Sequence, residues 1–443
     1  MLVIPGTHSG CGKSTVTLGV LSALKRMGHT VQPFKAGPDF IDPGLHGMIT
    51  GRASRNLDIW MCGRDYVLRC VKKHSAGADS AVVEGVMGLY DGAERSTAAL
   101  AGTLGANIIL VVDAYGMAES AGAVVKGFCS YGQEKIKISG VIFNRVSSKS
   151  HYERLRASVK NAEVLGFLPR DAGFSIPERH LGLYVAEEDP LGGAGLGRLT
   201  QMVLDNVDME AVYRLSQVDP GAGDPPRTAG GGLRIGVARD KAFCFYYEDN
   251  LDMLRVEGAE TVSFSPLLDE RLPDGIDALY LGGGYPELHA GMLAKNSPMR
   301  ESIRNCIEEG MPVYAECGGL MYLGEGININ GEFYPMCGVF PFRALMRERP
   351  VLGYRELTVP HACVLGERGD VLRGHEFHYS EVEKNPVETE SVKYNVFGER
   401  DRICSASYKS ALASYTHVHF GSKPDTAVKF IQFIKGRRKI PWR

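Results

Sequence analysis

The ten residues "GTHSGCGKST" at positions 6–15 constrain the fold more than any other feature of this sequence. They follow an apolar run typical of a strand, and they precede a segment in which Val16, Val20 and Leu24 recur at helical spacing. A glycine-rich loop between a strand and a helix can bind phosphate oxygens through its backbone N–H groups at the helix N-terminus. The pattern therefore predicts an α/β fold whose first loop binds phosphate.

The expected nucleotide contacts in this loop are Gly10, Gly12, Lys13, Ser14 and Thr15. The Lys13 ammonium can neutralise the β- and γ-phosphates of ATP, and the hydroxyl of Ser14 or Thr15 can ligate Mg²⁺. The strict pattern GxxxxGK[ST] would place a glycine at position 7, where Thr7 stands. An ordinary glycine-rich turn is the alternative, but the flanking strand and helix patterns favour a phosphate-binding loop.

Three acidic residues follow predicted strands close to this loop in the expected fold. Asp39 and Asp42 lie in "KAGPDFIDPG", and Glu84 ends the strand-like run "SAVVEG". The carboxyl ends of strands in an open α/β sheet face the ligand crevice, and Mg²⁺ prefers hard oxygen ligands. Each acid alone is equally well explained as a loop cap or a solvated charge. As a set they predict, together with Thr15, a magnesium site.

Strand-like runs alternate with helical patterns over residues 1–188, which is typical of a mostly parallel α/β sheet. Residues 189–232 contain two stretches rich in Gly and Pro on either side of a short helical pattern, as expected of a linker region. A second α/β pattern occupies residues 233–443 and includes one long predicted helix over 287–309. The sequence thus predicts an N-terminal P-loop domain, a linker and a C-terminal α/β domain.

Composition excludes several classes of protein. Lys plus Arg number 50 and Asp plus Glu number 52, so the balance fits neither a nucleic-acid coat nor an acidic tail, and no nucleic-acid partner is expected. No apolar run is long enough to span a membrane, and the first residues resemble a strand more than a signal peptide, so a cytoplasmic location is expected. The ten cysteines show no CxxC pair, which predicts reduced thiols.

Cys317 is the candidate nucleophile of the second half. In "PVYAECGGLMYL" an apolar strand pattern ends at Cys317, and two glycines precede a helical pattern, as in a nucleophile elbow. The N–H of Gly318 can contribute to an oxyanion hole, with Gly283 and Gly284 of "LYLGGGYPE" as the other donors. A lone cysteine is more often a small buried apolar residue. The surrounding glycines favour a catalytic role here.

A thiol nucleophile needs a general base. His417 and His419 in "SYTHVHF" are the first candidates, and His375 and His378 in "GHEFHYS" are the competitors. The residues alone do not choose among the four.

The second half resembles the cysteine-dependent (class I) glutamine amidotransferases, in which a nucleophile elbow is followed far downstream by a His-x-Glu pair. Here the pair is His417-Val418-His419. The resemblance implies that Cys317 and His417 are catalytic, that His419 occupies the position of the missing acid, and that the group orienting His417 is open.

The first half resembles the dethiobiotin-synthetase-like ATPases. The motifs "GTHSGCGKST", "PFKAGPDFIDPG", "VVEGVMGLYDG", "PERHLGL", "GGGYPE", "AECGGLMYL", "GHEFHYS" and "ASYTHVHF" together resemble the cobyrinate a,c-diamide synthase family over nearly the whole chain. Arg179 and His180 of "PERHLGL" are candidates for contact with a polycarboxylate substrate or for a structural role.

The resemblance implies ATP-dependent amidation of the a- and c-carboxylates of the corrinoid cobyrinate, through a phosphorylated carboxylate, with glutamine or ammonia as nitrogen donor and Mg²⁺ as cofactor. Amidation of hydrogenobyrinate or Ni-sirohydrochlorin is the alternative within the same chemistry. A non-catalytic nucleotide switch is the alternative from another class, and glutaminase activity would separate the two. The oligomeric state stays open, with a homodimer as one expectation.

Overall fold

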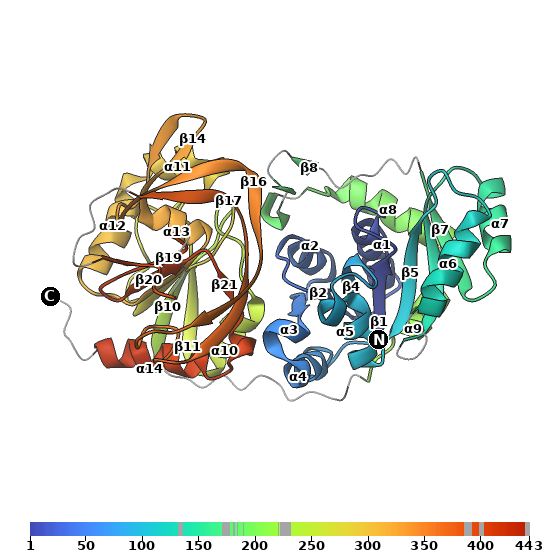
Figure 1. Ribbon diagram of the computed structural model, residues 1–443, viewed down its shortest axis with the longest axis horizontal. Coiled ribbons are helices and arrows are strands. Elements are labelled where there is room, and N and C mark those ends of the chain that lie inside the picture. The colour runs from blue at the N-terminus through green and yellow to red at the C-terminus, as the bar shows by residue number, and fades with distance from the viewer. Residues whose placement is uncertain are drawn as a thin grey trace. The chain divides into compact units, whose positions relative to one another are not determined.

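The computed structural model describes residues 1–131, 136–170, 178–179, 182–183, 185–188, 190–219, 221, 232–384, 392–397 and 403–438. The chain divides by compactness into two units, Met1–Pro225 and Pro226–Arg443, whose elements are labelled in Figure 1. The expected boundaries of the linker region at 189 and 232 stay a prediction. His180 lies outside the described residues.

The first unit is built on a seven-stranded sheet in the order β3-β2-β4-β1-β5-β6-β7, and every pairing is parallel. Its strands are β1 Leu2–Gly6, β2 Val31–Ala36, β3 Arg55–Leu57, β4 Ser80–Gly88, β5 Asn107–Asp113, β6 Ile138–Val146 and β7 Glu163–Pro169. The predicted α/β class is confirmed. The sequence did not predict β3, because three residues are too few for an alternation pattern.

Helices cover both faces of this sheet. They are α1 Lys13–Arg26, α2 Ile41–Thr50, α3 Ile59–Cys62, α4 Arg64–His74, α5 Thr97–Leu104, α6 Ser120–Tyr131, α7 Lys149–Ser158, α8 Gly193–Asn206 and α9 Met209–Ser216, with the 3-10 turns η1 Ala93–Arg95 and η2 Ala186–Glu188 and the short pair β8 Glu178–Arg179 and β9 Gly182–Leu183. Successive side chains of β1 enter different cores: Leu2 and Ile4 pack with α1 and α8, whereas Val3 packs on the opposite face.

The expected linker region contains two of these helices. Leu199, Met202 and Val203 form an apolar stripe on α8 and belong to the same core as α1. The two helices approach so closely that a Cβ on Gly19 would lie 2.6 Å from Val203 Cγ2. Apolar residues at helical spacing therefore fold this part of the region onto the first unit.

The second unit has a seven-stranded sheet in the order β11-β10-β12-β13-β20-β19-β18. Its strands are β10 Leu233–Ala238, β11 Ala259–Phe264, β12 Ala278–Leu281, β13 Val313–Glu316, β18 Val392–Tyr394, β19 Ser405–Tyr408 and β20 Ala411–Ser414. The first five strands in this order pair in parallel. β19 pairs antiparallel with both of its neighbours, β20 and β18.

The helices of this unit are α10 Glu248–Val256, η3 Pro286–His289, α11 Ala290–Lys295, α12 Ser297–Glu308, α13 Gly318–Leu323, η4 Phe420–Ser422 and α14 Thr426–Arg438. The single helix predicted over 287–309 is wrong. Asn296 caps α12, and Pro298 follows in its first turn, where a residue without an N–H group cannot continue the preceding helix.

A second, five-stranded sheet in the order β15-β14-β16-β17-β21 adjoins this core. Its strands are β14 Gly324–Ile329, β15 Glu332–Pro335, β16 Phe340–Thr358, β17 Val371–Lys384 and β21 His417–Val418. β17 pairs with β16 on one side and with β21 on the other, and its antiparallel pairing with β21 places His375 directly opposite His417. The topology therefore brings two of the four candidate histidines together.

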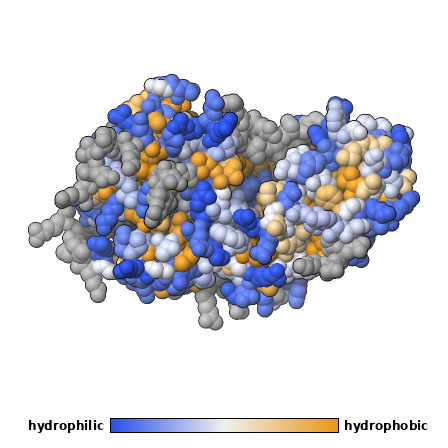
Figure 2. Space-filling model, in the orientation of Figure 1, coloured by the Kyte–Doolittle hydropathy of each residue, from blue (hydrophilic) through white to orange (hydrophobic). Residues whose placement is uncertain are grey.

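Each of the ten cysteines is a free thiol, which confirms the prediction of reduced thiols. Among the described residues, no helix has the length and apolar character needed to cross a membrane. Figure 2 shows hydrophilic residues spread over the visible face, with smaller hydrophobic areas between them.

Candidate active sites

The phosphate-binding loop connects β1 to α1, and glycine is required in it by backbone geometry. Gly10 and Gly12 have φ angles of +81° and +93°, a region that residues with a side chain rarely adopt. A Cβ on Gly12 would overlap the amide nitrogen of Asn144, which donates a hydrogen bond to Cys11 O at 3.0 Å. The loop is thereby fixed to the end of β6.

Lys13, Ser14 and Thr15 are the first three residues of α1, so their N–H groups have no acceptor within the helix. The hydroxyl of Ser14 donates to Glu84 Oε1 at 2.8 Å. Ser14 is therefore the hydroxyl that the structure places beside a predicted metal-binding carboxylate.

The three predicted metal-binding acids converge on one buried amine, that of Lys35. Its Nζ lies 2.5 Å from Asp42 Oδ2, 2.9 Å from Glu84 Oε1 and 3.7 Å from Asp39 Oδ2. On the other side, Glu84 Oε2 lies 2.8 Å from His46 Nε2. Lys35 and Glu84 are direct neighbours in the pairing of β2 with β4. Sequence reasoning missed Lys35 and His46.

Burial and charge act in opposite directions in this cluster. Burial alone would lower the pKa of Lys35, but the carboxylates of Asp42, Glu84 and Asp39 outweigh it and raise that pKa above its ordinary value. Burial would raise the pKa of Glu84, whereas Lys35 and His46 hold it well below its ordinary value. Burial and the charge of Glu84 raise the pKa of Asp42. The cluster is therefore built around the positive charge of Lys35.

A cavity of about 590 Å³ opens beside the ends of β5, β6 and β7. Tyr115 is 54% exposed there, and the guanidinium groups of Arg145 and Arg170 lie 5.4 Å and 4.5 Å from its ring centroid. Asp113 holds Arg145 through two hydrogen bonds. Two guanidinium groups over an exposed aromatic ring, one of them held by a carboxylate, suit an anionic ligand.

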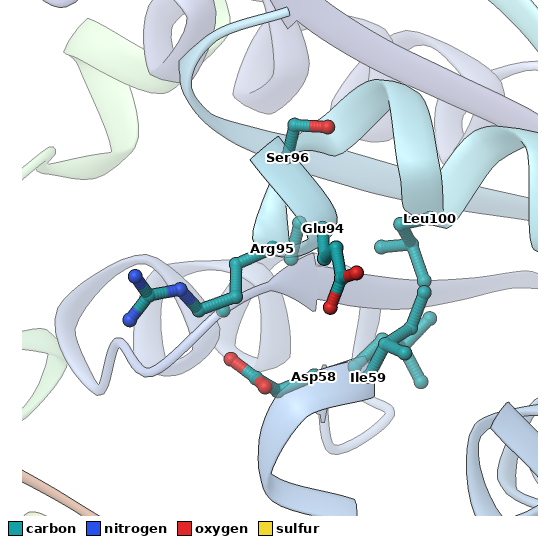
Figure 3. A pocket seen from close by; sticks show the side chains of 9 residues that line it. Asp58, Ile59, Glu94, Arg95, Ser96 and Leu100 are labelled. Atoms are coloured by element: carbon teal, nitrogen blue, oxygen red, sulfur yellow. The ribbon is translucent and has the colours of Figure 1, made fainter. Parts of the chain in front are cut away.

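A second, smaller pocket lies beside the ends of β2 and β3. Figure 3 shows Asp58 and Ile59 at its lower edge, with Glu94, Arg95 and Ser96 above. Its volume of about 10 Å³ is that of roughly one water molecule, so it cannot hold a nucleotide or a larger substrate.

Cys317 occupies a strained turn between β13 and α13. Its φ of 46° and ψ of −99° are unusual for a residue with a side chain, and its N–H donates to Ser414 O at 2.7 Å. A Cβ on Gly318 would lie 2.9 Å from Pro286 Cδ, and one on Gly319 would overlap Leu281 O. The two glycines are therefore needed for the turn, as the elbow pattern predicts.

The three predicted oxyanion donors do not have the same geometry. Gly283 directs its N–H to Phe245 O at 3.2 Å, so this group is already used within the backbone. Gly284 N would lie 3.2 Å from a Cβ on Gly318, which places these two residues side by side next to Cys317. Gly283 instead leaves space for His417, since a Cβ there would overlap the imidazole ring.

His417 and Cys317 border the same space. A Cβ on Gly283 would lie 3.2 Å from His417 Nε2 and 3.4 Å from Cys317 Cβ, so these atoms are no farther apart than the sum of those distances. Burial raises the pKa of the Cys317 thiol, the carboxylate of Glu287 adds to the rise, and the N–H of Gly318 opposes it. The resting thiol therefore holds its proton, and a neighbouring base is needed to remove it.

The other three histidines are held by different groups. His375 Nδ1 lies 2.7 Å from the Tyr247 hydroxyl. His378 Nδ1 donates to Ser380 O at 2.7 Å. His419 Nδ1 accepts the N–H of Gly421 at 3.0 Å, and its Nε2 lies 3.8 Å from Asp249 Oδ2. The His417 ring, in contrast, lies beside Gly283 together with Cys317 Cβ.

Comparison with known proteins agrees with this arrangement. Residues 2–183 match the model of the CobQ/CobB/MinD/ParA nucleotide binding domain, and residues 234–425 match that of the CobB/CobQ-like glutamine amidotransferase domain. A cobyrinate a,c-diamide synthase of Syntrophotalea carbinolica is 41% identical, with 98% of each chain covered. Proteins of the same name from Listeria innocua and a Synechococcus strain are each 40% identical, with 99% and 97% of each chain covered. The chain belongs to the cobyrinate a,c-diamide synthase family.

Proposed function

We propose that this chain is an ATP-dependent ligase that amidates the a- and c-carboxylates of cobyrinate, with glutamine or ammonia as nitrogen donor. One observation carries the proposal: a single chain holds both a phosphate-binding loop beside a buried carboxylate cluster and a strained cysteine turn beside a histidine. The full-length likeness to proteins named cobyrinate a,c-diamide synthase supports the choice of substrate.

The first unit activates the carboxylate. Hydroxide is too poor a leaving group for ammonia to displace, so ATP phosphorylates the carboxylate oxygen and phosphate leaves when the amide forms. The loop amides and Lys13 hold the transferring phosphoryl group. Lys35, which no motif revealed, brings a second fixed cation to the same edge of the sheet.

The oxygen atoms of Ser14, Asp42 and Glu84 suit a Mg²⁺ ion, because hydroxyl and carboxylate groups are its preferred protein ligands. When bound, the ion neutralises charge on the β- and γ-phosphates. Thr15 shares the turn of Ser14, and Asp39 is the more distant acid of the cluster, so both stay as secondary ligand candidates.

The cavity around Tyr115 is the proposed site of the adenosine part of ATP. It lies at the carboxyl ends of β5 to β7, and Asn144 ties the end of β6 to the phosphate-binding loop. Arg145 and Arg170, whose guanidinium groups lie over the Tyr115 ring, would face the phosphates or the ribose.

The second unit releases ammonia from glutamine. The Cys317 sulfur attacks the side-chain amide carbon, and the N–H groups of Gly284 and Gly318 stabilise the oxyanion. His417 takes the thiol proton and gives it to the departing nitrogen, so ammonia and a thioester form. Water then cleaves the thioester to glutamate and restores the thiol.

A non-catalytic nucleotide switch is not favoured, because it would not need the strained cysteine turn of the second unit. A cytoplasmic location and a homodimer stay predictions.

Mass spectrometry after incubation with MgATP and glutamine tests the proposal directly. Cobyrinate, hydrogenobyrinate and Ni-sirohydrochlorin are supplied in separate reactions. We expect two successive mass decreases with cobyrinate, each equal to replacement of OH by NH₂. Reaction of the nickel compound alone would retain the chemistry and change the substrate. Glutamine hydrolysis without any amidated product would overturn the substrate assignment, and absence of glutamine hydrolysis would overturn the proposed function itself.

A further inference from the structure

Glu316 immediately precedes the nucleophile, at the end of β13. Glu316 is the last residue of β13, and Cys317 follows it in the turn that leads to α13. Ala315 and Cys317 both pack in the core that contains α12 and α13, whereas Tyr314, which lies on the same face of β13 as Glu316, packs with Val418 and Phe420. An acid on a strand that is otherwise buried and uncharged needs a physical reason.

The Glu316 carboxylate has no exposed surface. Burial of a carboxylate is unfavourable unless hydrogen bonds and opposite charge compensate. Its Oε1 accepts hydrogen bonds from the Tyr314 hydroxyl at 2.7 Å and from the Val418 N–H at 3.1 Å. The second of these bonds fixes the carboxylate to β21, the strand that carries His417.

The other oxygen, Oε2, faces the imidazole. It lies 3.5 Å from His417 Nδ1 and has no hydrogen-bond partner within the described part of the chain. The opposite edge of the same ring, with Nε2, borders Gly283 and Cys317. The His417 ring therefore lies between the two residues, with Nδ1 toward Glu316 and Nε2 toward Cys317.

We infer that Glu316 is the positioning residue of His417, the acid that completes a cysteine–histidine–acid triad. The inference rests on the proposed glutaminase function of this site. A Glu316 carboxylate at Nδ1 keeps the proton on that nitrogen, so Nε2 stays available for the thiol proton. It also stabilises the imidazolium that forms when Cys317 becomes a thiolate, without itself taking a proton. His419, in the usual sequence position of the acid, is directed to Asp249 instead.

Other ionisable groups also surround His417. His375 of β17 stacks on it with ring centroids 5.1 Å apart, and Cys317 borders it from the turn after β13. Tyr280 and Tyr314 lie on the far side of Glu316, and burial together with the Glu316 charge raises the pKa of both phenols. Of the charged groups among these neighbours, Glu316 is the one beside Nδ1.

Glu316→Gln is the decisive variant, because its amide oxygen can still accept from Tyr314 and Val418 while its NH₂ group meets Nδ1. An NH₂ donor at Nδ1 favours the tautomer with the proton on Nε2, which cannot accept the thiol proton. We expect glutaminase kcat to fall roughly 10⁴-fold, with ammonium-dependent amidation retained. We also expect the acid limb of the kcat/KM profile against pH to move to lower pH, since the imidazolium loses its counter-charge.

Two further variants keep the test decisive. Glu316→Asp retains the charge, so it should recover part of the lost glutaminase activity and the wild-type position of the acid limb. Asp249→Asn removes the acid paired with His419 and should leave glutaminase activity within a few-fold of wild type. If Glu316→Gln also loses ammonium-dependent amidation, recovery of both activities in the Asp variant supports the inference and lack of recovery overturns it.

Glutaminase activity of Glu316→Gln equal to wild type, or a loss without any shift of the acid limb, would overturn the role of Glu316. Absence of glutaminase activity in the wild-type protein would instead overturn the proposed function. The two failures are thus distinguishable.

Discussion

At the level of single residues, Cys317 and Lys13 serve two different steps of the proposed reaction: release of ammonia from glutamine and phosphoryl transfer from ATP. Cys317→Ser should abolish amidation with glutamine but leave amidation with added ammonium, because the thiol is needed only to release ammonia. Lys13→Ala should abolish amidation with either nitrogen source, because phosphoryl transfer loses its fixed cation, while glutamine hydrolysis continues at least in part. Product mass and glutamate release, measured in parallel, check both expectations.

Each of the two variants serves as the control of the other. Equal loss with both nitrogen sources in Cys317→Ser would contradict its assignment as the nucleophile. Amidation at the wild-type rate in Lys13→Ala would contradict the phosphate-binding role of the loop.

His375 makes the second unit sensitive to acid. Burial and the neighbouring His417 and His419 hold the pKa of His375 well below its ordinary value. Below pH 6.5 the unfolded chain therefore binds a proton at this position that the folded chain refuses, so stability rises with pH and falls on acidification. In this range the free energy of unfolding should rise with pH by up to about 1.4 kcal/mol per pH unit because of His375. We expect His375→Gln to lack this contribution to the slope. Denaturation of wild type and variant across pH 4–7 measures it, and identical slopes would be contrary to this explanation.

At the level of elements, two glycines flank α1: Gly12 precedes the helix in the phosphate-binding loop, and Gly28 follows the helix. We expect the loop to depend on Gly12 but not on Gly28. Both glycines have φ near +90°, at +93° and +94°. A side chain at 12 would also displace Asn144, whereas one at 28 would meet open space. Gly28→Ala should therefore be destabilising by only about 1–2 kcal/mol and leave amidation intact. Gly12→Ala should impair ATP-dependent amidation strongly.

Steady-state kinetics in MgATP gives the measurement, with glutamine hydrolysis as the internal reference. The two alanine variants would need to differ in KM for ATP or in kcat for amidation. Indistinguishable kinetics would show that contact with Asn144 does not hold the loop in its functional form.

Glycine is also the reason that these elements could be predicted from the sequence. The phosphate-binding loop and the turn at Cys317 need backbone conformations or close approaches that favour glycine, so the residue type itself reports the geometry. Lys35 gives no such signal, because a basic residue at a strand end looks the same whether it is solvated or buried. Its partner Glu84 lies on a different strand, and only the insertion of β4 between β1 and β2 makes them neighbours.

The helical part of the expected linker region shows a related limit. Residues 193–216 lie between two Gly- and Pro-rich stretches, and their apolar residues are too few to identify a core by themselves. Their partner is α1, more than a hundred residues earlier, so the packing of Leu199 and Val203 depends on the tertiary fold.

At the level of the whole molecule, the two units should unfold as separate cooperative blocks. Residues of the two cores of the first unit all precede position 226, and those of the two cores of the second unit all follow it. A non-hydrolysable ATP analogue with Mg²⁺ should raise the melting temperature of one calorimetric transition only. At 100 times its dissociation constant it would stabilise that unit by about 2.7 kcal/mol. A single transition that moves as a whole would contradict independent folding.

The position of Glu316 next to Cys317 also affects how related sequences tolerate insertions and how sequence searches classify them. In the His-x-Glu arrangement the acid lies far from the nucleophile in the sequence, so an insertion or deletion in the intervening chain can separate the two. In this chain the inferred acid and the proposed nucleophile are adjacent residues: Glu316 contacts Val418, whereas Cys317 packs in the core on the other side of the sheet. A survey that seeks the acid only after the histidine would count such enzymes as incomplete, whereas a search for the dipeptide Glu-Cys before paired glycines would recover them.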